Sequence, residues 1–221
     1  MTPPFRALPA IPDHPALEHE VLDWWERERI FERVRERNAG GRPWTFLDGP
    51  ITANNPMGVH HCWGRSLKDL FQRYRALQGY DLHYQNGFDC QGLHVEVEVE
   101  RSLGLNSKRE IEAYGLAEFA RRCRERVAHY ANVITEQSRR LGMWMDWPNS
   151  YYTFSDTNIE YIWRFLKESH DRGRLYKGHR ATEWCPRCGT SISQHELVGP
   201  DAYADLVHPS LDLFRCMFSQ P

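Results

Sequence analysis

The sequence predicts an α/β fold with parallel strands, and three consecutive segments carry that prediction. Residues 44–48 form a short apolar run of good β-forming residues, which is typical of a buried strand. Apolar residues then recur at spacings of three and four, as on an amphipathic helix that packs on a core: Leu67, Leu70, Phe71, Tyr74 and Leu77. Residues 80–85 have the composition of a second strand. Strand, helix and strand in this order form a βαβ unit, whose two strands are expected to be parallel.

The connection between the first strand and the helix is a candidate anion-binding site. Residues 49–58 are uncharged and crowded with turn-forming residues. We expect the helix to begin near Val59, so that His60 and His61 lie in its first turn. The start of a helix carries free N–H groups and the positive end of the helix dipole, so it can bind an anion. Two histidines and Arg65 at this place indicate a binding site for a nucleotide phosphate. The alternative is a plain strand–helix connection with surface histidines, because the loop matches neither the Walker loop nor GxGxxG.

A second polar loop, residues 86–92, follows the second strand. Ligands in open α/β sheets bind at the carboxyl ends of parallel strands, so this loop and residues 49–58 are expected to face one crevice. Asp89 is the natural carboxylate of that crevice. Its alternative role is to cap the segment that follows.

The remaining elements are predicted to be mainly helical. Leu17, Val21, Trp24 and Trp25 mark one helix that reaches residues 30–31, and residues 33–42 form a polar connector. Residues 94–103 alternate valine and glutamate, and we favour a helix over a strand there. Ser107 and Glu110 form a capping box. A long helix with an inward stripe, an aromatic core corner at 143–147, and a helix capped by Ser155 and ended by Gly173 complete the prediction. The stripe of the long helix is Leu116, Phe119, Cys123, Val127, Tyr130, Ile134 and Leu141, and that of the last helix is Ile159, Ile162, Trp163 and Leu166.

Composition places the chain among globular proteins. It has 221 residues, of which 41% are apolar and 26% charged, and its net charge of −2 gives no signature of a bulk nucleic-acid binder. The arginines between 121 and 140 are interpreted as a solvated helix surface. No apolar stretch reaches the ~20 residues of a membrane span, and no secretory signal is recognised, so a cytoplasmic location without a membrane partner is expected. Six scattered cysteines agree with a reducing compartment.

One cysteine pair has the spacing of a metal site. An extended arm over 175–184 leads to Cys185-Pro-Arg-Cys-Gly-Thr190, in which Cys185 and Cys188 resemble half of a zinc knuckle. Zinc needs about four ligands. His179, His195 and Cys216 could complete the set, although their spacing gives no support. A zinc-ribbon interaction module is therefore one alternative function.

Several motifs, in order and spacing, together resemble the N-terminal part of the class I aminoacyl-tRNA synthetases of the isoleucine, valine and leucine group. The similarity is greatest to isoleucyl-tRNA synthetases and covers residues 17–203. The motifs are Asp48-Gly-Pro-Ile-Thr-Ala-Asn54, Arg65-Ser-Leu-Lys-Asp69, Arg73-Tyr-Arg-Ala-Leu-Gln-Gly-Tyr80, Gly87-Phe-Asp89, Ser107-Lys-Arg-Glu-Ile-Glu-Ala-Tyr-Gly115, Leu175-Tyr-Lys-Gly-His179 and Cys185-Pro-Arg-Cys-Gly-Thr190.

The resemblance implies an incomplete Rossmann-like parallel sheet with helices, then a helical segment and a small zinc-ribbon-like β arm. The implied division is an N-terminal helical extension at 1–43, half of the catalytic domain at 44–174, and the start of a connective insertion at 175–221. The implied activity is activation of isoleucine with ATP and Mg²⁺, followed by transfer to tRNA.

The same resemblance assigns site residues. It implies catalytic roles for His60 and His61 in the HIGH signature, whose histidines stabilise the triphosphate. It implies ATP-binding roles for Asn54, Gly58, His60 and His61, and amino-acid-binding roles for Gly49, Ile51, Asp89 and Gln91, with Asp89 receiving the α-ammonium group. Zn²⁺ at Cys185 and Cys188 is a further expectation.

Three departures from the family pattern alter the expected activity. The signature is Gly58-Val-His-His61, so its first histidine is a glycine and its small third residue is His60. Cys90 and Gln91 replace a usual Thr-His pair, and His94 replaces a proline. The chain also contains no KMSKS-like run, editing domain or anticodon-binding region. We therefore expect an isoleucyl-type fragment that is inactive alone, either a gene fragment or one piece of a split enzyme whose missing half is on a complementary chain. The alternatives are a valyl- or leucyl-type fragment, or a free-standing relative that binds an amino acid or nucleotide without ligation.

Overall fold

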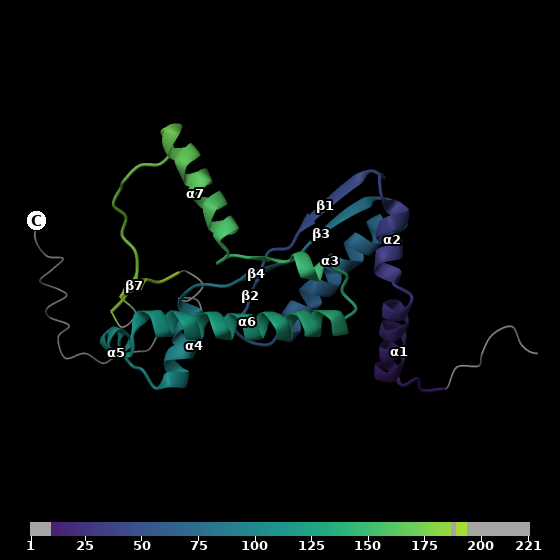
Figure 1. Ribbon diagram of the computed structural model, residues 1–221, viewed down its shortest axis with the longest axis horizontal. Helices are drawn as coiled ribbons and strands as arrows, with labels where there is room; N and C mark the ends of the chain where they lie inside the picture. Colours follow the sequence, from purple (N-terminus) through teal and green to yellow (C-terminus); the bar gives the residue numbers. More distant parts are fainter. Residues whose placement is uncertain (1–9, 187–188, 194–221) are drawn as a thin grey trace, which may run out of the picture. The chain divides into compact units, whose positions relative to one another are not determined.

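The computed structural model describes residues 10–186 and 189–193 (Figure 1). Contacts divide the chain into two units, Met1–Tyr176 and Lys177–Pro221. The first unit holds α1 His14–Arg27, α2 Ile30–Asn38, β1 Pro43–Leu47, β2 Ile51–Thr52, α3 Val59–Leu77, β3 Asp81–Gln85, β4 Gly87–Asp89, α4 Leu93–Leu103, α5 Lys108–Tyr114, α6 Leu116–Arg140, a 3₁₀ turn at Trp147–Asn149, β5 Tyr151–Tyr152 and α7 Asp156–Asp171. The described part of the second unit holds the antiparallel pair β6 Trp184–Cys185 and β7 Thr190–Ser191.

The predicted βαβ unit is confirmed. β1 and β3 pair in parallel, with Trp44 opposite Leu82 and Phe46 opposite Tyr84, and α3 connects them. Those four side chains point to one face of the pair, where they form a core cluster with Ala76 of α3, Met143 and Met145. The predicted core corner at 143–147 is confirmed by the burial of these two methionines.

A second parallel sheet continues the first. Its order is β2-β4-β5, and β4 begins two residues after β3 ends. Its core joins Phe88 of β4 and Val95 of α4 to the inward stripe of α6. Val127 and Ile134 of that stripe are buried, as predicted, whereas Leu116 and Leu141 at its ends are exposed.

Two inward faces were predicted wrongly. The strand at 44–48 is not buried, because only one of its faces is covered and Leu47 on the other face is 64% exposed. All five predicted stripe residues of α3 are exposed as well. The face of α3 that points inward carries Arg65, Gln72 and Ala76 instead.

The N-terminal segment is also corrected. The predicted helix breaks at Arg29, whose φ of 51° lies in the left-handed region and ends the helical hydrogen-bond pattern. The predicted polar connector at 33–42 is mostly α2. Asn38 ends α2 and is buried, with its side-chain Nδ2 donating to the carbonyls of Ala76 and Tyr80 at 2.8 and 3.1 Å. α2 is thereby tied to the end of α3.

The later helices begin where they were predicted, and one faces differently. Residues 94–103 are helical in α4, and Ser107 Oγ accepts the N–H of Glu110 at the start of α5, which confirms Ser107 as the N-cap. The Glu110 carboxylate accepts from the N–H of Asn106 and from Ser107 Oγ, in place of the Ser107 N–H that the predicted capping box requires. Ser155 likewise caps α7. The inward stripe of α7 is wrong in part, because Ile162 and Trp163 are exposed while Ile159 and Leu166 are half-buried. Among the described helices, none has the length and apolar character needed to cross a membrane.

Candidate functional site

The two predicted loops lie against each other. β2 pairs with β4 in parallel, and Thr52 lies opposite Asp89. Thr52 Oγ1 donates to Asp89 Oδ2 at 3.2 Å, and the N–H of Ala53 donates to the carbonyl of Asp89 at 2.9 Å. The expected closeness of residues 49–58 and 86–92 is therefore observed. Asp89 does not cap α4, which begins at Leu93 after Gly92.

Two histidines lie in the first turn of α3. The backbone N–H of Gly58 donates to Nδ1 of His61 at 3.1 Å, so the proton of the neutral ring is on Nε2. Burial, with nearby His60 and Arg65 as smaller causes, lowers the pKa of His61. The neutral ring therefore predominates at pH 7 and offers Nε2–H as a donor. The ring of exposed His60 lies 3.9 Å away, centroid to centroid.

His60 fills the space beside Gly58. A Cβ atom on Gly58 would lie 2.9 Å from Cε1 and 3.0 Å from Nδ1 of His60, closer than side chains normally approach. Residue 58 is the position of the first signature histidine in the resemblance described above. An imidazole is therefore present beside position 58 although the residue there is glycine.

A buried charge cluster joins the site loops to α3. Asp48 and Arg65 are fully buried, and Arg65 Nη2 lies 3.3 Å from Asp48 Oδ2, while Lys68 Nζ lies 2.7 Å from Asp48 Oδ1. Both terminal nitrogens of Arg65 also donate to Asn86 Oδ1, at 3.4 Å. Burial lowers the pKa of Arg65, and Asp48 opposes that shift. The cluster fixes the carboxyl end of β1 and the loop after β3 to one face of α3.

Tyr151 of β5 adds a further tie to that end of β1. Its hydroxyl donates to the carbonyl of Asp48 at 2.8 Å. Its ring lies directly over Gly87, where any side chain would clash with it. Glycine at 87 is therefore required by the close approach of the ring.

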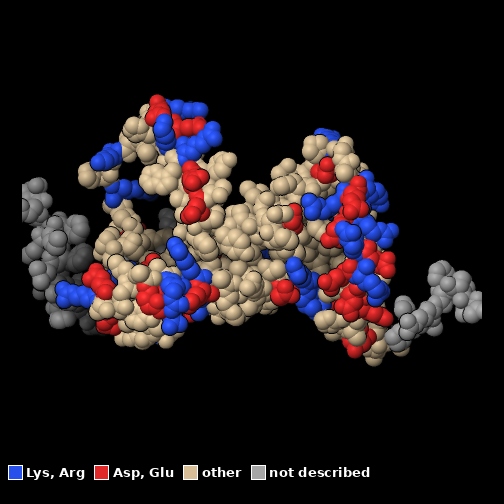
Figure 2. Space-filling model, in the orientation of Figure 1, with Lys and Arg blue, Asp and Glu red and all other residues tan. Residues whose placement is uncertain are grey.

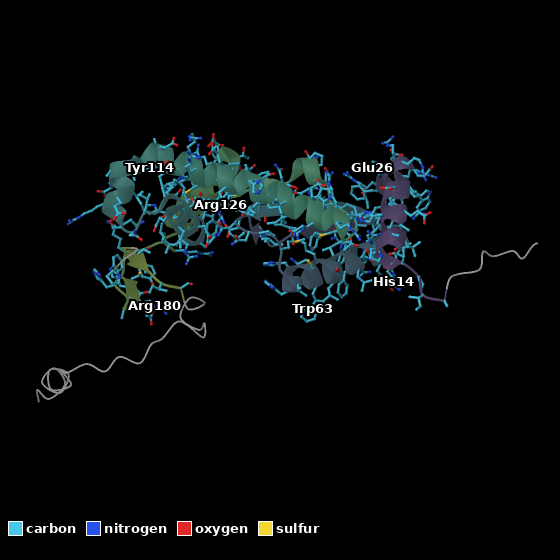
Figure 3. The ribbon with its side chains drawn as sticks, turned by 90° about the horizontal axis from the view of Figure 1, so that it is seen from below. His14, Glu26, Trp63, Tyr114, Arg126 and Arg180 are labelled. Atoms are coloured by element: carbon cyan, nitrogen blue, oxygen red, sulfur yellow. The ribbon has the colours of Figure 1, made fainter. Side chains whose placement is uncertain are left out.

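Asn54 has a structural role inside the loop. Its Nδ2 donates to the carbonyl of His94 at 2.7 Å, and its Oδ1 and carbonyl accept from Arg126 of α6 at 2.7 and 2.9 Å. Asn54 is buried, so its amide is engaged within the protein. Arg126, labelled in Figure 3, was assigned to the solvated surface, and that assignment is wrong. Arg126 is one of several arginines in this segment, and nothing in the sequence distinguishes it as the one that contacts the loop.

The other residues predicted to bind the amino acid are Gly49, Ile51 and Gln91, and they differ in how they are held. Gly49 is exposed in the connection between β1 and β2, and Ile51 of β2 packs against the core cluster that contains Phe88. Gln91 is exposed, with Nε2 at 3.5 Å from the carbonyl of Thr153. Ile51 is therefore fixed by packing, whereas Gln91 faces solvent.

The predicted zinc site falls on the turn between β6 and β7. The N–H of Gly189 donates to the carbonyl of Cys185 at 2.8 Å, which closes a tight turn between β6 and β7. Cys188 lies outside the described residues, as do His195 and Cys216. Within residues 10–186 and 189–193, no group of three or more His, Cys, Asp and Glu side chains could hold a metal ion.

Two hollows lie away from these loops. They have volumes of about 660 and 550 Å³ and are lined by residues of α1, α2, the end of α6 and the segment that follows it. None of the predicted site residues lines either hollow.

Comparison with known proteins decides the family. The family model of the class I tRNA synthetases (I, L, M and V) matches residues 20–209. The chain belongs to this family. The isoleucine–tRNA ligase of Streptomyces coelicolor is 44% identical over 210 residues, and that of Thermus thermophilus is 46% identical over 200 residues. These matches cover 95% and 90% of this chain, and 20% and 19% of the relatives. This class I synthetase chain thus spans about one-fifth of their length.

The fold is that of a class I synthetase. The crystal structure of the ternary complex of Agrobacterium radiobacter K84 agnB2 LeuRS, tRNA and LeuAMS matches with a TM-score of 0.62 and 18% identity. The match covers 85% of this chain and 21% of that one. Parallel strands with helical connections are therefore arranged in this chain as in a solved member of the family.

Proposed function

We propose that this chain carries the ATP- and amino-acid-binding part of an isoleucine–tRNA ligase. The observation that carries the proposal is the pairing of β2 with β4, which holds Asp89 beside the loop that leads to His60 and His61. The reaction joins the carboxylate of isoleucine to the α-phosphate of ATP with release of pyrophosphate, and a tRNA hydroxyl then takes the aminoacyl group with release of AMP. Mg²⁺ enters with the nucleotide.

The first turn of α3 suits the triphosphate. Catalysis of phosphoryl and nucleotidyl transfer depends on positioning and on donors aimed at developing negative charge. The free N–H groups of a helix start and the Nε2–H of His61 are such donors. We assign Gly58, His60 and His61 to this part of the site, and Asn54 to holding the loop in shape through Arg126.

Asp89 suits the α-ammonium group of the amino acid. Its Oδ2 accepts from Thr52, and a charge-assisted bond from an ammonium group would be the stronger partner for the remaining carboxylate lone pairs. Gly49, Ile51 and Gln91 are proposed to line the same pocket. Ile51 is the member of this set that packs against the core, so it is placed to limit the size of the substrate side chain that the pocket accepts.

His60 is proposed to replace the missing signature histidine. Its ring already occupies the space beside Gly58 that a side chain at 58 would need. The double variant Gly58→His, His60→Gly restores the family arrangement and should bind ATP with wild-type affinity. His60→Ala alone should weaken ATP binding at least about tenfold, the loss expected for one hydrogen bond to a charged group. Equal affinity of His60→Ala and the wild type would contradict this role.

The second unit and the domain division are part of the same proposal. We assign the start of a zinc-bearing insertion to 175–221, with Cys185 and Cys188 as two of the ligands, the half-catalytic domain to 44–174, and the helical extension to 1–43. The closed turn at Gly189 supports the zinc assignment, because zinc knuckles use glycine to close the turn. Zinc analysis of the purified chain tests it, with one equivalent expected and Cys185→Ser as the control.

Calorimetric titration of the whole chain tests the central proposal. ATP, isoleucine, valine, leucine and a non-hydrolysable isoleucyl-adenylate analogue are the ligands. The analogue should bind most tightly, and isoleucine should bind better than valine or leucine. Asp89→Asn should weaken amino-acid binding at least tenfold, or about 1.4 kcal/mol. Asp156→Asn, in the exposed first turn of α7, is the matched control.

The outcomes separate the candidate functions. Binding of the analogue, together with isoleucine-dependent ATP–pyrophosphate exchange, establishes ligase chemistry. Binding without exchange agrees with a ligase fragment that is inactive alone and equally with a relative that binds without ligation. Tighter binding of valine or leucine than of isoleucine would identify that amino acid as the substrate. Absence of binding by every ligand would overturn the proposal.

A further inference from the structure

The loop at 49–58, called the site loop below, is attached to the rest of the fold in two places. Its first half, residues 49–53, contains β2, which pairs with β4. The N–H of Ala53 extends this pairing by donating to the carbonyl of Asp89 at 2.9 Å. Tyr151 of β5 holds the point where the half begins, because its hydroxyl donates to the carbonyl of Asp48 at 2.8 Å. The first half is therefore attached to β4 and β5.

Tyr151 touches both polar loops of the site. Its ring lies over Gly87, which is also its register partner in the pairing of β4 with β5. A peptide group is planar, so the bond from the Tyr151 hydroxyl to the Asp48 carbonyl also fixes the direction of the Gly49 N–H in the same group. Burial, followed by nearby Asp48 and Asp89, raises the pKa of Tyr151. The phenol therefore stays protonated at neutral pH and remains a donor.

The second half of the site loop, residues 54–58, is attached to α6 instead. Arg126 donates to Oδ1 and to the carbonyl of Asn54 at 2.7 and 2.9 Å. The N–H of Met57 donates to Gln137 Oε1 at 2.8 Å. Both partners of this half belong to α6, and neither of these contacts involves β4 or β5. The two halves of the loop thus have separate attachments.

We propose that Tyr151 is a positioning residue for the amino acid, and that it acts on the first half of the site loop independently of the second half. Gly49 and Ile51, assigned to the amino acid, lie in the first half. Asn54 and Gly58, assigned to the ATP part of the site, lie in the second. This division of ligands rests on the proposed function, whereas the separate attachment of the two halves does not. Tyr151 acts through the backbone that its hydroxyl holds.

Hydrogen exchange of single amides, measured by NMR on the full chain without ligands, tests the separate attachments. Tyr151→Phe keeps the ring over Gly87 and removes only the hydroxyl. The Ala53 amide should then exchange about 3- to 10-fold faster, as expected for one lost hydrogen bond, and the Met57 amide should exchange as before. Gln137→Ala removes the acceptor of Met57 and should give the reverse result.

Tyr152→Phe is the matched control. Tyr152 is the next residue of β5, and its ring packs against Phe88. Its hydroxyl takes part in none of the hydrogen bonds of the described residues, so the exchange of Ala53 should equal that of the wild type. Charged side chains of both signs gather over α1 in Figure 2, as on a solvated surface. Amides of α1 serve as the internal reference, since Tyr151 makes the contacts described above with β1 and β4.

Calorimetric titration tests the link to the two ligands. Tyr151→Phe should raise the Kd of isoleucine about 3- to 10-fold and change the Kd of ATP less than about twofold. Gln137→Ala should raise the Kd of ATP by a similar factor and leave that of isoleucine nearly unchanged. A general loss of stability would weaken both ligands in both variants, so the crossed pattern distinguishes positioning from a merely structural role.

Two results would overturn the inference. One is exchange of the Ala53 amide in Tyr151→Phe that equals its exchange in Tyr152→Phe. The other is an isoleucine affinity of Tyr151→Phe that is unchanged, or that falls together with the affinity for ATP. A wild-type chain that binds neither ligand would overturn the proposed function instead. The exchange of Ala53 and Met57 would still decide whether Tyr151 holds the first half of the loop independently.

Discussion

α6 and α3 carry the same kind of apolar stripe, yet one is buried and the other exposed. In α6, Val127 and Ile134 lie in the core, and charged residues face solvent. In α3, Leu70 and Phe71 face solvent, while Arg65 lies in the interior against Asp48. Periodicity therefore predicts a helix and which of its faces is apolar. It does not predict whether another segment of the protein covers that face. Within the described residues, no segment covers the apolar face of α3.

Removing the buried carboxylate of Asp48 should have the largest effect on stability, because it is the counter-charge of the arginine on the inward face of α3. Asp48→Asn would leave Arg65 buried without its counter-charge, at an expected cost of about 3–5 kcal/mol in the free energy of unfolding. Urea denaturation measures this cost. Glu168→Gln, in an exposed ion pair on α7, is the control and should not change the midpoint. Equal midpoints for Asp48→Asn and the wild type would mean that the cluster is not a stabilising element.

Truncating matched apolar residues tests the comparison directly. Ile134→Ala on α6 removes a fully buried side chain and should cost about 2–5 kcal/mol. Leu70→Ala on α3 should change the free energy of unfolding by less than about 0.5 kcal/mol, because its side chain already contacts water. Denaturant unfolding of both variants provides the measurement. A large cost at Leu70 in the isolated chain would show that the exposed apolar face of α3 is covered there.

Arg126 tests one of the polar contacts between α6 and the site loop; Gln137 Oε1, which accepts the N–H of Met57 at 2.8 Å, is another. Arg126→Gln removes the donors to Asn54 and should cost about 1.5–3 kcal/mol. Arg122→Gln, in an exposed pair on the same helix, is the matched control. Thermal unfolding compares the two variants. Similar melting temperatures would contradict a role for Arg126 in holding the loop.

The smallest effect is expected from the first turn of α3. The folded chain has a His61 pKa below the unfolded value of about 6.5, so the unfolded chain binds the proton first as pH falls. Stability contributed by neutral His61 is therefore complete above pH 6.5 and declines below it. Between pH 7.5 and pH 5.5, the urea concentration at the unfolding midpoint should decrease less in His61→Gln than in the wild type. An identical fall in both chains would rule out His61 as a source of the pH dependence.

Local patterns predicted much of the fold. The parallel pairing of β1 and β3, the start of α3 at Val59 and the N-cap at Ser107 each depend on residues near in sequence. The break at Arg29 was missed because its left-handed backbone is unusual for arginine. The inward faces of α3 and α7 were wrong because burial depends on distant segments.

The site was predictable to the extent that topology fixes it. Ligands bind at the carboxyl ends of parallel strands, and this rule predicted from the sequence that residues 49–58 and 86–92 lie close together. Asn54 was assigned to ATP on resemblance, whereas its amide is engaged by His94 and Arg126. Contacts across 72 residues, such as that of Arg126 with Asn54, leave no local trace in the sequence.

The packing of His60 against Gly58 makes these two positions interdependent in evolution. An ancestor with histidine at 58 could reach the present arrangement by two orders of substitution. One order passes through two crowded imidazoles, and the other passes through a chain with neither. A histidine placed at 58 would have to displace the His60 ring, because a Cβ atom there would lie 2.9 Å from Cε1 of His60. Substitutions at 58 and at 60 are therefore expected to have non-additive effects.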